Sequence, residues 1–294
     1  MTDETASHRR AMIVLVIGAC VIGVGPILVR LSDVGPATAG FWRLIFAMPL
    51  LAFLAHRGAD GVGPPNRIAL FAGIAFALDL GFWHYGIAYT SVAKATVLSN
   101  LTPVVVTACA WIFLKQRPTR LFLLAVAIAV AGAWLMAISA GRGSLGLNPP
   151  LGDALSATTA IWYALYFIAI SQARQTLAAT RIMFWSSFAG APLLLLAGVG
   201  LGEDLVPGSP VGWAACAGLG LMHVAGQGAI AWSLGKLPTA TASVVVLIQP
   251  VVAAILGWLL FNEMFGAWQA AGAALALAGV ILAQWSSTTR QAAS

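Results

Sequence analysis

Long apolar stretches separated by short polar connections fill almost the whole chain. A hydrocarbon core roughly 30 Å thick is crossed by a helix of about 20 apolar residues, so each stretch is a candidate transmembrane helix. The pattern predicts an all-α integral membrane protein with no soluble domain. Ten spans are expected, at residues 12–31, 37–56, 68–89, 93–114, 119–139, 152–172, 181–200, 211–234, 238–261 and 267–285.

The second five spans repeat landmarks of the first five. Phe41-Trp42 followed by Pro49-Leu50-Leu51 recurs with identical spacing as Phe184-Trp185 followed by Pro192-Leu193-Leu194. An offset of 147 superposes a second set of residues, namely Ala93, Ala95, Val97, Pro103, Val104, Val105, Trp111 and Gly132 on Ala240, Ala242, Val244, Pro250, Val251, Val252, Trp258 and Gly279. Because five is odd, the copy at 146–294 is expected to be inverted relative to the copy at 1–145, around a central cavity.

Composition and charge agree with a membrane protein. Only 8% of residues are charged and 60% are hydrophobic, whereas a soluble domain carries roughly 25% charged residues. The net charge of +6 is scattered over short loops, so no nucleic-acid partner is expected. The cysteines lie far apart inside apolar stretches and the four histidines are dispersed, so we expect no metal and no cofactor. An enzyme is not expected, because no catalytic cluster is apparent.

The basic residues predict the orientation of the chain. If the N-terminus is cytoplasmic, the outer face holds only Arg30, Lys94 and Arg142. The cytoplasmic face then collects Arg9, Arg10, Arg57, Arg67, Lys115, Arg117, Arg120, Arg174, Arg181, Lys236 and Arg290. This asymmetry follows the positive-inside rule and predicts that both termini are cytoplasmic.

Several ordered motifs carry a resemblance to a known family. They are Tyr89-Thr90-Ser91-Val92-Ala93 leading to Leu101-Thr102-Pro103-Val104-Val105, and Leu237-Pro238-Thr239-Ala240-Thr241-Ala242 leading to Gln249-Pro250-Val251 and Phe261-Asn262-Glu263. The chain resembles the drug/metabolite transporter (DMT) superfamily, specifically the ten-helix EamA-type exporters, and is most similar to the YddG-type amino-acid exporters. That resemblance implies export across a bacterial inner membrane. The family's paired glutamates are matched by Glu263 but replaced by Gln116 in the first copy.

Polar side chains deep in a bilayer are costly unless they face protein or water, so they mark candidate pathway positions. Asp79 and Trp83 lie four residues apart in the third span, as do His223 and Gln227 in the eighth. Asp79 is interpreted as a pathway residue or a neutral structural one, and His223 as a substrate contact or a packing histidine. His84 lies about 140° around the helix from Asp79 and is expected to face a neighbouring helix.

Three other spans add candidate residues. In the sixth, Thr159, Trp162, Tyr163 and Tyr166 share a face at mid-helix, which suits either an aromatic cavity wall or core packing. In the fourth, Thr96, Asn100 and Pro103 share a face, with Ser99 alongside. In the ninth, Gln249 either satisfies backbone groups freed by Pro250 or contacts substrate. Arg43, about six residues inside the second span, either snorkels outward or serves the site.

Proline, glycine and alanine patterns indicate mobile and rigid parts. The hinge candidates are Gly25, Pro26, Pro49, Pro103, Pro192 and Pro250. The fifth and tenth spans are rich in small residues, with Ala125 and Gly132 matching Gly272 and Gly279. They are expected to be scaffold or a dimer contact.

These features predict a secondary transporter that works by alternating access, with the lipid bilayer and a small-molecule substrate as partners. Amino acids, aromatic and other neutral ones above all, are favoured: Asp79 would bind the ammonium, and hydroxyl, amide or imidazole donors the carboxylate. Nucleosides or cationic drugs are alternative substrates, and a channel or a membrane enzyme is the alternative class. Proton coupling stays open, and a monomer or weak dimer is expected.

Overall fold

The computed structural model describes residues 3–58, 61–90, 95, 98–139, 148–261 and 266–291. This described part of the chain is helical and contains no β-strand. Its first half holds α1 (Asp3–Ile22), α2 (Gly25–Arg30), α3 (Pro36–Arg57), α4 (Arg67–Tyr89), α6 (Thr102–Leu114) and α7 (Arg120–Ser139). Its second half holds α8 (Pro149–Ala173), α9 (Ala179–Leu201), α10 (Pro210–Met222), the π-helix η1 (His223–Gln227), α11 (Gly228–Leu234), α12 (Thr239–Val245), α13 (Ile248–Phe261) and α14 (Ala267–Gln291).

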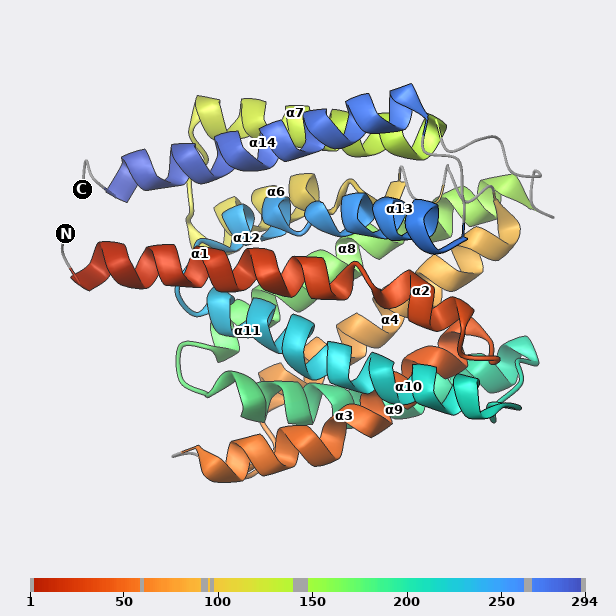
Figure 1. Ribbon diagram of the computed structural model, residues 1–294. Coiled ribbons are helices and arrows are strands. Elements are labelled where there is room, and N and C mark those ends of the chain that lie inside the picture. Colours follow the sequence, from red (N-terminus) through yellow and green to blue (C-terminus); the bar gives the residue numbers. More distant parts are fainter. Residues whose placement is uncertain are drawn as a thin grey trace.

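The helices run roughly parallel to one another in a stack, from the pair α7 and α14 at one side to the pair α3 and α9 at the other (Figure 1). Most of the contacting pairs join the two halves: α4 packs on α8 and α9, α10 on α3, and α6 on α12. Both chain termini lie at the same end of the bundle, at the left of Figure 1. We call this the terminal end.

The expected membrane spans agree with the observed helices over most of the chain. Eight helices or helix runs among the described residues are long and apolar enough to cross a bilayer: Ala6–Arg30, Pro36–Arg57, Arg120–Ser139, Pro149–Ala173, Ala179–Leu201, Pro210–Leu234, Thr239–Phe261 and Ala267–Ser286. The third expected span corresponds to α4, which has 23 residues. The described part of the fourth includes the shorter apolar helix α6. The protein is therefore a multi-pass membrane protein.

Four of the expected spans are not single regular helices, and one of them is the eighth, which contains the π-helix η1. The first ends as α1 at Ile22 and restarts as α2, with Pro26 in the first turn. The fourth has a turn at Asn100–Leu101 before α6, which starts at Thr102. The ninth is interrupted at Val246–Leu247. Helical wheels drawn through these points therefore misplace the residues beyond them.

The expected hinge positions fall into two groups. Pro103 and Pro250 each lie in the first turn of a helix that follows an interruption, as Pro26 does. By contrast, α3 continues through Pro49 and α9 continues through Pro192. The backbone ladder is thus interrupted near three of the prolines and continues past the other two.

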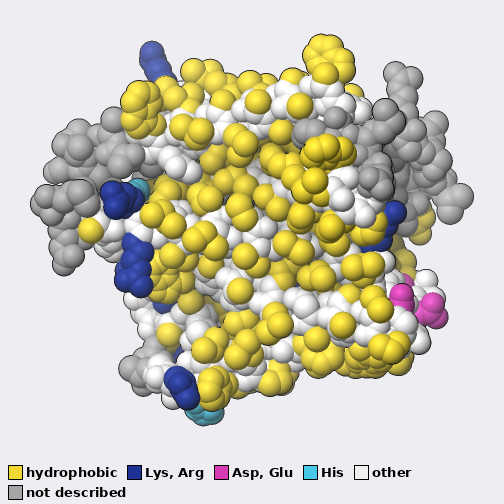
Figure 2. All heavy atoms as spheres, in the orientation of Figure 1, with side chains coloured by type: hydrophobic (Ala, Val, Ile, Leu, Met, Phe, Trp, Pro, Cys, Tyr) yellow, Lys and Arg dark blue, Asp and Glu magenta, His cyan; other side chains and the backbone are white. Residues whose placement is uncertain are grey.

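The outer surface has the distribution expected of a protein embedded in lipid. A broad belt of apolar side chains covers the face shown in Figure 2. Basic side chains gather mostly at the terminal end, and the visible acidic groups lie at the opposite end. On the face shown, the charged side chains thus lie toward the two ends of the bundle.

The small residues of α7 and α14 face each other. A Cβ added to Gly132 would lie 2.2 Å from the backbone nitrogen of Ala276, and one added to Gly279 would lie 2.4 Å from that of Ala129. The two backbones are therefore in near contact, which small side chains permit. The glycine faces of these helices are used inside the chain, as the scaffold interpretation expected.

Candidate functional site

Polar and aromatic side chains from five elements meet near the middle of the bundle. The group comprises Arg43 of α3, Asp79 of α4, Tyr163 and Tyr166 of α8, Ser187 of α9, and His223 and Gln227 of η1. All except the half-buried Tyr163 are buried. The helices that supply them come from both halves of the chain, so this polar cluster lies where the halves meet.

The centre of the polar cluster is a hydrogen-bonded chain of three residues. Arg43 Nε donates to His223 Nδ1 over 3.1 Å. His223 Nε2 lies 3.3 Å from the hydroxyl of Ser187. Because Nδ1 accepts, a neutral His223 carries its proton on Nε2 and donates to Ser187. The imidazole thus links α3 to α9.

The inward position of Arg43 corrects one of the two interpretations of that residue. A snorkelling arginine reaches toward water with its guanidinium, but Arg43 is only 9% exposed and its guanidinium lies 5.2 Å from the ring centroid of Phe76. The side chain therefore belongs to the polar cluster. Its place inside a predicted span is the signal in the sequence that points to it.

His223 and Gln227 lie at the two ends of the π-helical turn η1, which interrupts the α10–α11 run. Both side chains are 1% exposed. A π-turn widens the helix by one residue per turn and is frequent at functional sites. The regular four-residue face assumed from the sequence therefore does not describe this segment, although both residues do turn inward.

Two tyrosines form the wall of the polar cluster on the α8 side. Tyr163 and Tyr166 stack with ring centroids 5.9 Å apart and an interplanar angle of 12°. Gln227 Nε2 donates to the hydroxyl of Tyr166 over 3.0 Å. The Tyr166 ring also lies 5.0 Å from that of Phe76. The aromatic face expected on the sixth span thus contributes two of its members to the cluster.

Asp79 brings a carboxyl group to the polar cluster. It is 8% exposed and lies three residues beyond Phe76 on α4. It interacts electrostatically with Arg43, but the structure shows no direct ion pair between these two described side chains. A buried guanidinium and a buried carboxyl group therefore lie in one polar cluster without a direct ion pair between them.

Other candidate residues lie beside the polar cluster. Trp162 is half-buried and packs near Phe82, with ring centroids 6.1 Å apart. Thr159 is buried and its hydroxyl donates within its own helix to the carbonyl of Leu155. Trp83 is half-buried on α4. The role of these three residues in the site stays a prediction.

The fourth and ninth spans place two amides beside their helix interruptions. The side-chain nitrogens of Asn100 and Gln249 are buried and have no hydrogen-bond partner among the described residues. Gln249 therefore does not donate to a carbonyl freed by Pro250, which weakens that interpretation. The carbonyl of Ser99 accepts from the hydroxyl of Thr102 and closes the turn before α6.

A few predicted positions lie outside the described residues. They are Thr96, the side chain of His84, the repeat members Ala93 and Val97, the loop residues Lys94 and Arg142, and Asn262 and Glu263 of the last motif.

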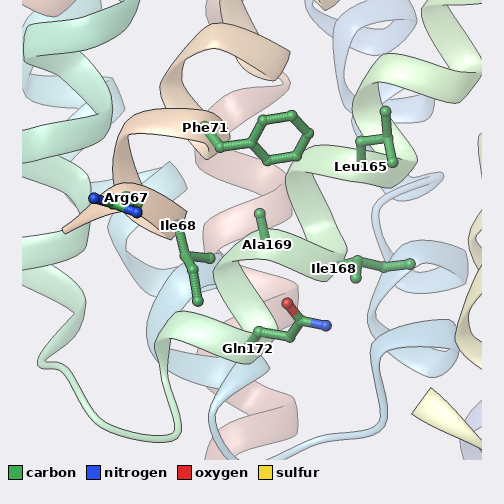
Figure 3. A pocket seen from close by; sticks show the side chains of 7 residues that line it. All are labelled: Arg67, Ile68, Phe71, Leu165, Ile168, Ala169 and Gln172. Atoms are coloured by element: carbon green, nitrogen blue, oxygen red, sulfur yellow. The ribbon is translucent and has the colours of Figure 1, made fainter. Parts of the chain in front are cut away.

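A separate hollow of about 220 Å³ lies between α4 and α8 toward the terminal end. Figure 3 shows Arg67, Ile68 and Phe71 of α4 on one side of it and side chains of α8 on the other, among them Gln172. The lining is mostly apolar and includes none of the candidate site residues. This hollow is distinct from the polar cluster.

Comparison with known proteins agrees with this picture. The model of the EamA-like transporter family matches the chain twice, at residues 9–138 and 150–285. An uncharacterized transporter of Archaeoglobus fulgidus is 27% identical over 270 residues, which cover 92% of this chain and 94% of the relative. A solved structure, titled only as the crystal structure of a protein, matches with a TM-score of 0.80 and 16% identity over 97% of this chain and 98% of the other, which shows a shared fold.

Proposed function

Because the chain belongs to the EamA-like transporter family, we propose that it is a secondary transporter that exports amino acids or related small metabolites by alternating access. The observation that carries the proposal is the polar cluster itself: polar, hydrogen-bonding and aromatic side chains buried where the two halves of the chain meet. Such groups are costly inside a bilayer and are typical of substrate pathways. Export from a bacterial cytoplasm, with both termini inside, is part of the proposal.

Contacts around the repeated tryptophans support an inverted duplication. Trp42 Nε1 donates to the carbonyl of Leu205, in the loop between α9 and α10. Its counterpart Trp185 donates to the carbonyl of Val62, in the loop between α3 and α4. Each tryptophan thus holds the equivalent loop of the other half, and the two loops lie at opposite ends of the bundle (Figure 1).

Interrupted helices support alternating access. In transporters with inverted repeats, substrate sites near the bilayer midplane are commonly formed beside discontinuous helices. Here η1 supplies His223 and Gln227 directly. Beside the interruptions before α6 and α13, the amide nitrogens of Asn100 and Gln249 have no partner among the residues that the structure describes. Rocking of one half against the other would open the polar cluster first to one end and then to the other.

Transport assays with purified protein in proteoliposomes test this function. The panel holds amino acids, nucleosides and cationic drugs, and the readout is saturable uptake with stimulation by substrate on the opposite side. We expect amino acids to be carried with both properties, and flux without saturation or counterflow would indicate a channel instead.

Variants of the polar cluster test the site. Asp79→Asn and Tyr166→Phe remove a charge and a hydroxyl with little change in volume, so normal insertion is expected together with a clear loss of transport. Leu196→Ala, at an exposed position on α9, is the matched control. Wild-type rates in both cluster variants would place the site elsewhere.

A further inference from the structure

We infer that Arg43 binds the substrate carboxylate. The site would therefore select zwitterions that carry an ammonium and a carboxylate on neighbouring atoms. This inference rests on the proposed transport function and gives its site a chemical preference.

The first step is the set of donors that Arg43 leaves unused. A guanidinium has five N–H donors and stays charged inside proteins. Within the described residues, Arg43 makes one hydrogen bond, from Nε to His223. Its two terminal amino groups, with four N–H donors, therefore have no protein acceptor in that part of the chain.

Burial makes these donors significant. Arg43 is 9% exposed inside a bundle that faces lipid. An uncompensated buried charge is strongly unfavourable, because the water removed from it is not replaced by a partner of opposite charge. A bound anion would supply the missing partner.

The neighbours of Arg43 determine which edge is available. His223 occupies Nε, and the Phe76 ring lies over the guanidinium at 5.2 Å. The hydroxyl of Ser187 lies 3.3 Å from Nε2 of His223, so both ring nitrogens of the imidazole have a hydrogen-bond partner. The terminal pair of amino groups is left as the free edge, and two parallel N–H groups match the two oxygens of a carboxylate.

Asp79 sets the second half of the preference. It is a buried carboxyl group that interacts with Arg43 and forms no direct ion pair with it among the described residues. A simple anion would find a partner only in Arg43, and a simple cation only in the carboxyl group of Asp79. A zwitterion satisfies both, and the stacked Tyr163 and Tyr166 provide an apolar surface for its side chain.

The test compares matched solutes in proteoliposomes at mildly acidic pH. Phenylalanine has both charges, phenylalaninamide has only the ammonium, and 3-phenylpropanoate has only the carboxylate. We expect the wild-type protein to carry phenylalanine about tenfold or more faster than either analogue, because a site built to hydrogen-bond a group rejects a molecule that lacks it.

Arg43→Gln should change that preference rather than abolish transport. Phenylalanine uptake should fall by about thirtyfold while phenylalaninamide uptake changes less than about threefold, since only the carboxylate loses its partner. Arg43→Lys should retain an intermediate preference because a single ammonium replaces the two-pronged donor. Ser186→Ala, at the repeat counterpart of Arg43, should leave the ratio of phenylalanine uptake to phenylalaninamide uptake unchanged.

The possible failures are distinguishable. If the wild-type protein carries phenylalanine but does not discriminate against phenylalaninamide, the inference that Arg43 binds the carboxylate is wrong and the proposed transport function stands. This result does not depend on the folding of any variant. An unchanged ratio of phenylalanine uptake to phenylalaninamide uptake in a well-inserted Arg43→Gln protein would lead to the same conclusion. If the wild-type protein carries no amino acid at all, the proposed substrate class and the inferred role of Arg43 are both wrong.

Discussion

Helices α3 and α9 share a sequence pattern and a structural role but differ in one side chain. Each carries the Phe-Trp pair and the Pro-Leu-Leu run, and each uses its tryptophan to hold a loop of the other half. The residue after the tryptophan is Arg43 in α3 and Ser186 in α9. Arg43 reaches His223, whereas the backbone of Ser186 packs closely on Gly73 of α4. The sequence pattern and the loop contact occur in both helices, but the charge at this position occurs only in α3.

Exchanging these two residues gives the largest expected effect. Arg43→Ser makes α3 match α9, and transport of a zwitterion should fall about 100-fold, since loss of a buried charged partner worth about 3 kcal/mol corresponds to that factor. Adding Ser186→Arg should not restore the rate, because position 186 faces α4. Initial uptake rates, normalised to inserted protein, measure both. Full recovery in the double variant would show that the halves are interchangeable.

Close helix contacts offer a second comparison, with effects on stability. A Cβ at Gly73 would lie 2.1 Å from the carbonyl oxygen of Ser186, and one at Gly220 would lie 2.6 Å from Cβ of Phe46. Gly73→Ala and Gly220→Ala should each lower the free energy of unfolding by about 1–3 kcal/mol, as overpacking does. The loss should be larger for Gly73→Ala, because the added carbon meets backbone atoms, which move less easily than a side chain.

Thermal unfolding in detergent measures both glycine variants. Gly81→Ala is the control on α4, since nothing lies within 4 Å of the added carbon. Equal melting temperatures for the Gly73 and Gly81 variants would contradict the close approach of α4 and α9.

The first turns of α3 and α9 differ in their capping. Neither helix has a side-chain cap from its own N-cap residue, but Glu203 accepts hydrogen bonds from the backbone nitrogens of Ala37 at 3.1 Å and Thr38 at 2.8 Å in α3. Glu203→Gln should cost about 1 kcal/mol, because a negative charge at a helix N-terminus is favourable. The neighbouring exposed Asp204→Asn is the control, and the same unfolding assay reports both. Equal loss in the two variants would point to general surface charge instead.

The smallest effects are expected at the tryptophans. Trp42→Phe and Trp185→Phe each remove one N–H donor to a loop carbonyl, worth about 1 kcal/mol. The two losses should be equal within error in chemical or thermal unfolding. A loss confined to one of them would mean that the matched sequence does not reflect matched structure.

Much of the fold was accessible from the sequence because lipid imposes strict rules. Spans must be long, apolar and hydrogen-bonded internally, so hydropathy alone locates them. The interruption near Pro26 is also visible as a Gly-Pro pair. The ends of α1 were less predictable, since its first turns at Asp3–Arg10 are polar and continue the helix beyond the apolar stretch.

The polar cluster was harder to assemble from sequence for a geometric reason. Wheel diagrams assume 3.6 residues per turn, but η1 departs from that spacing between His223 and Gln227. The direction of Arg43 depends on which helix lies opposite it, which no local pattern records. Ser187 carries no sequence signal at all, because a serine in an apolar span is as common in packing as in recognition.

The common location of the two chain ends has a practical consequence. Since α1 begins and α14 finishes at one end of the bundle (Figure 1), two copies joined head to tail by a flexible linker would need no additional bilayer crossing. Such a tandem gene product, with an inactivating change in one copy only, would reveal whether each copy moves its cargo independently.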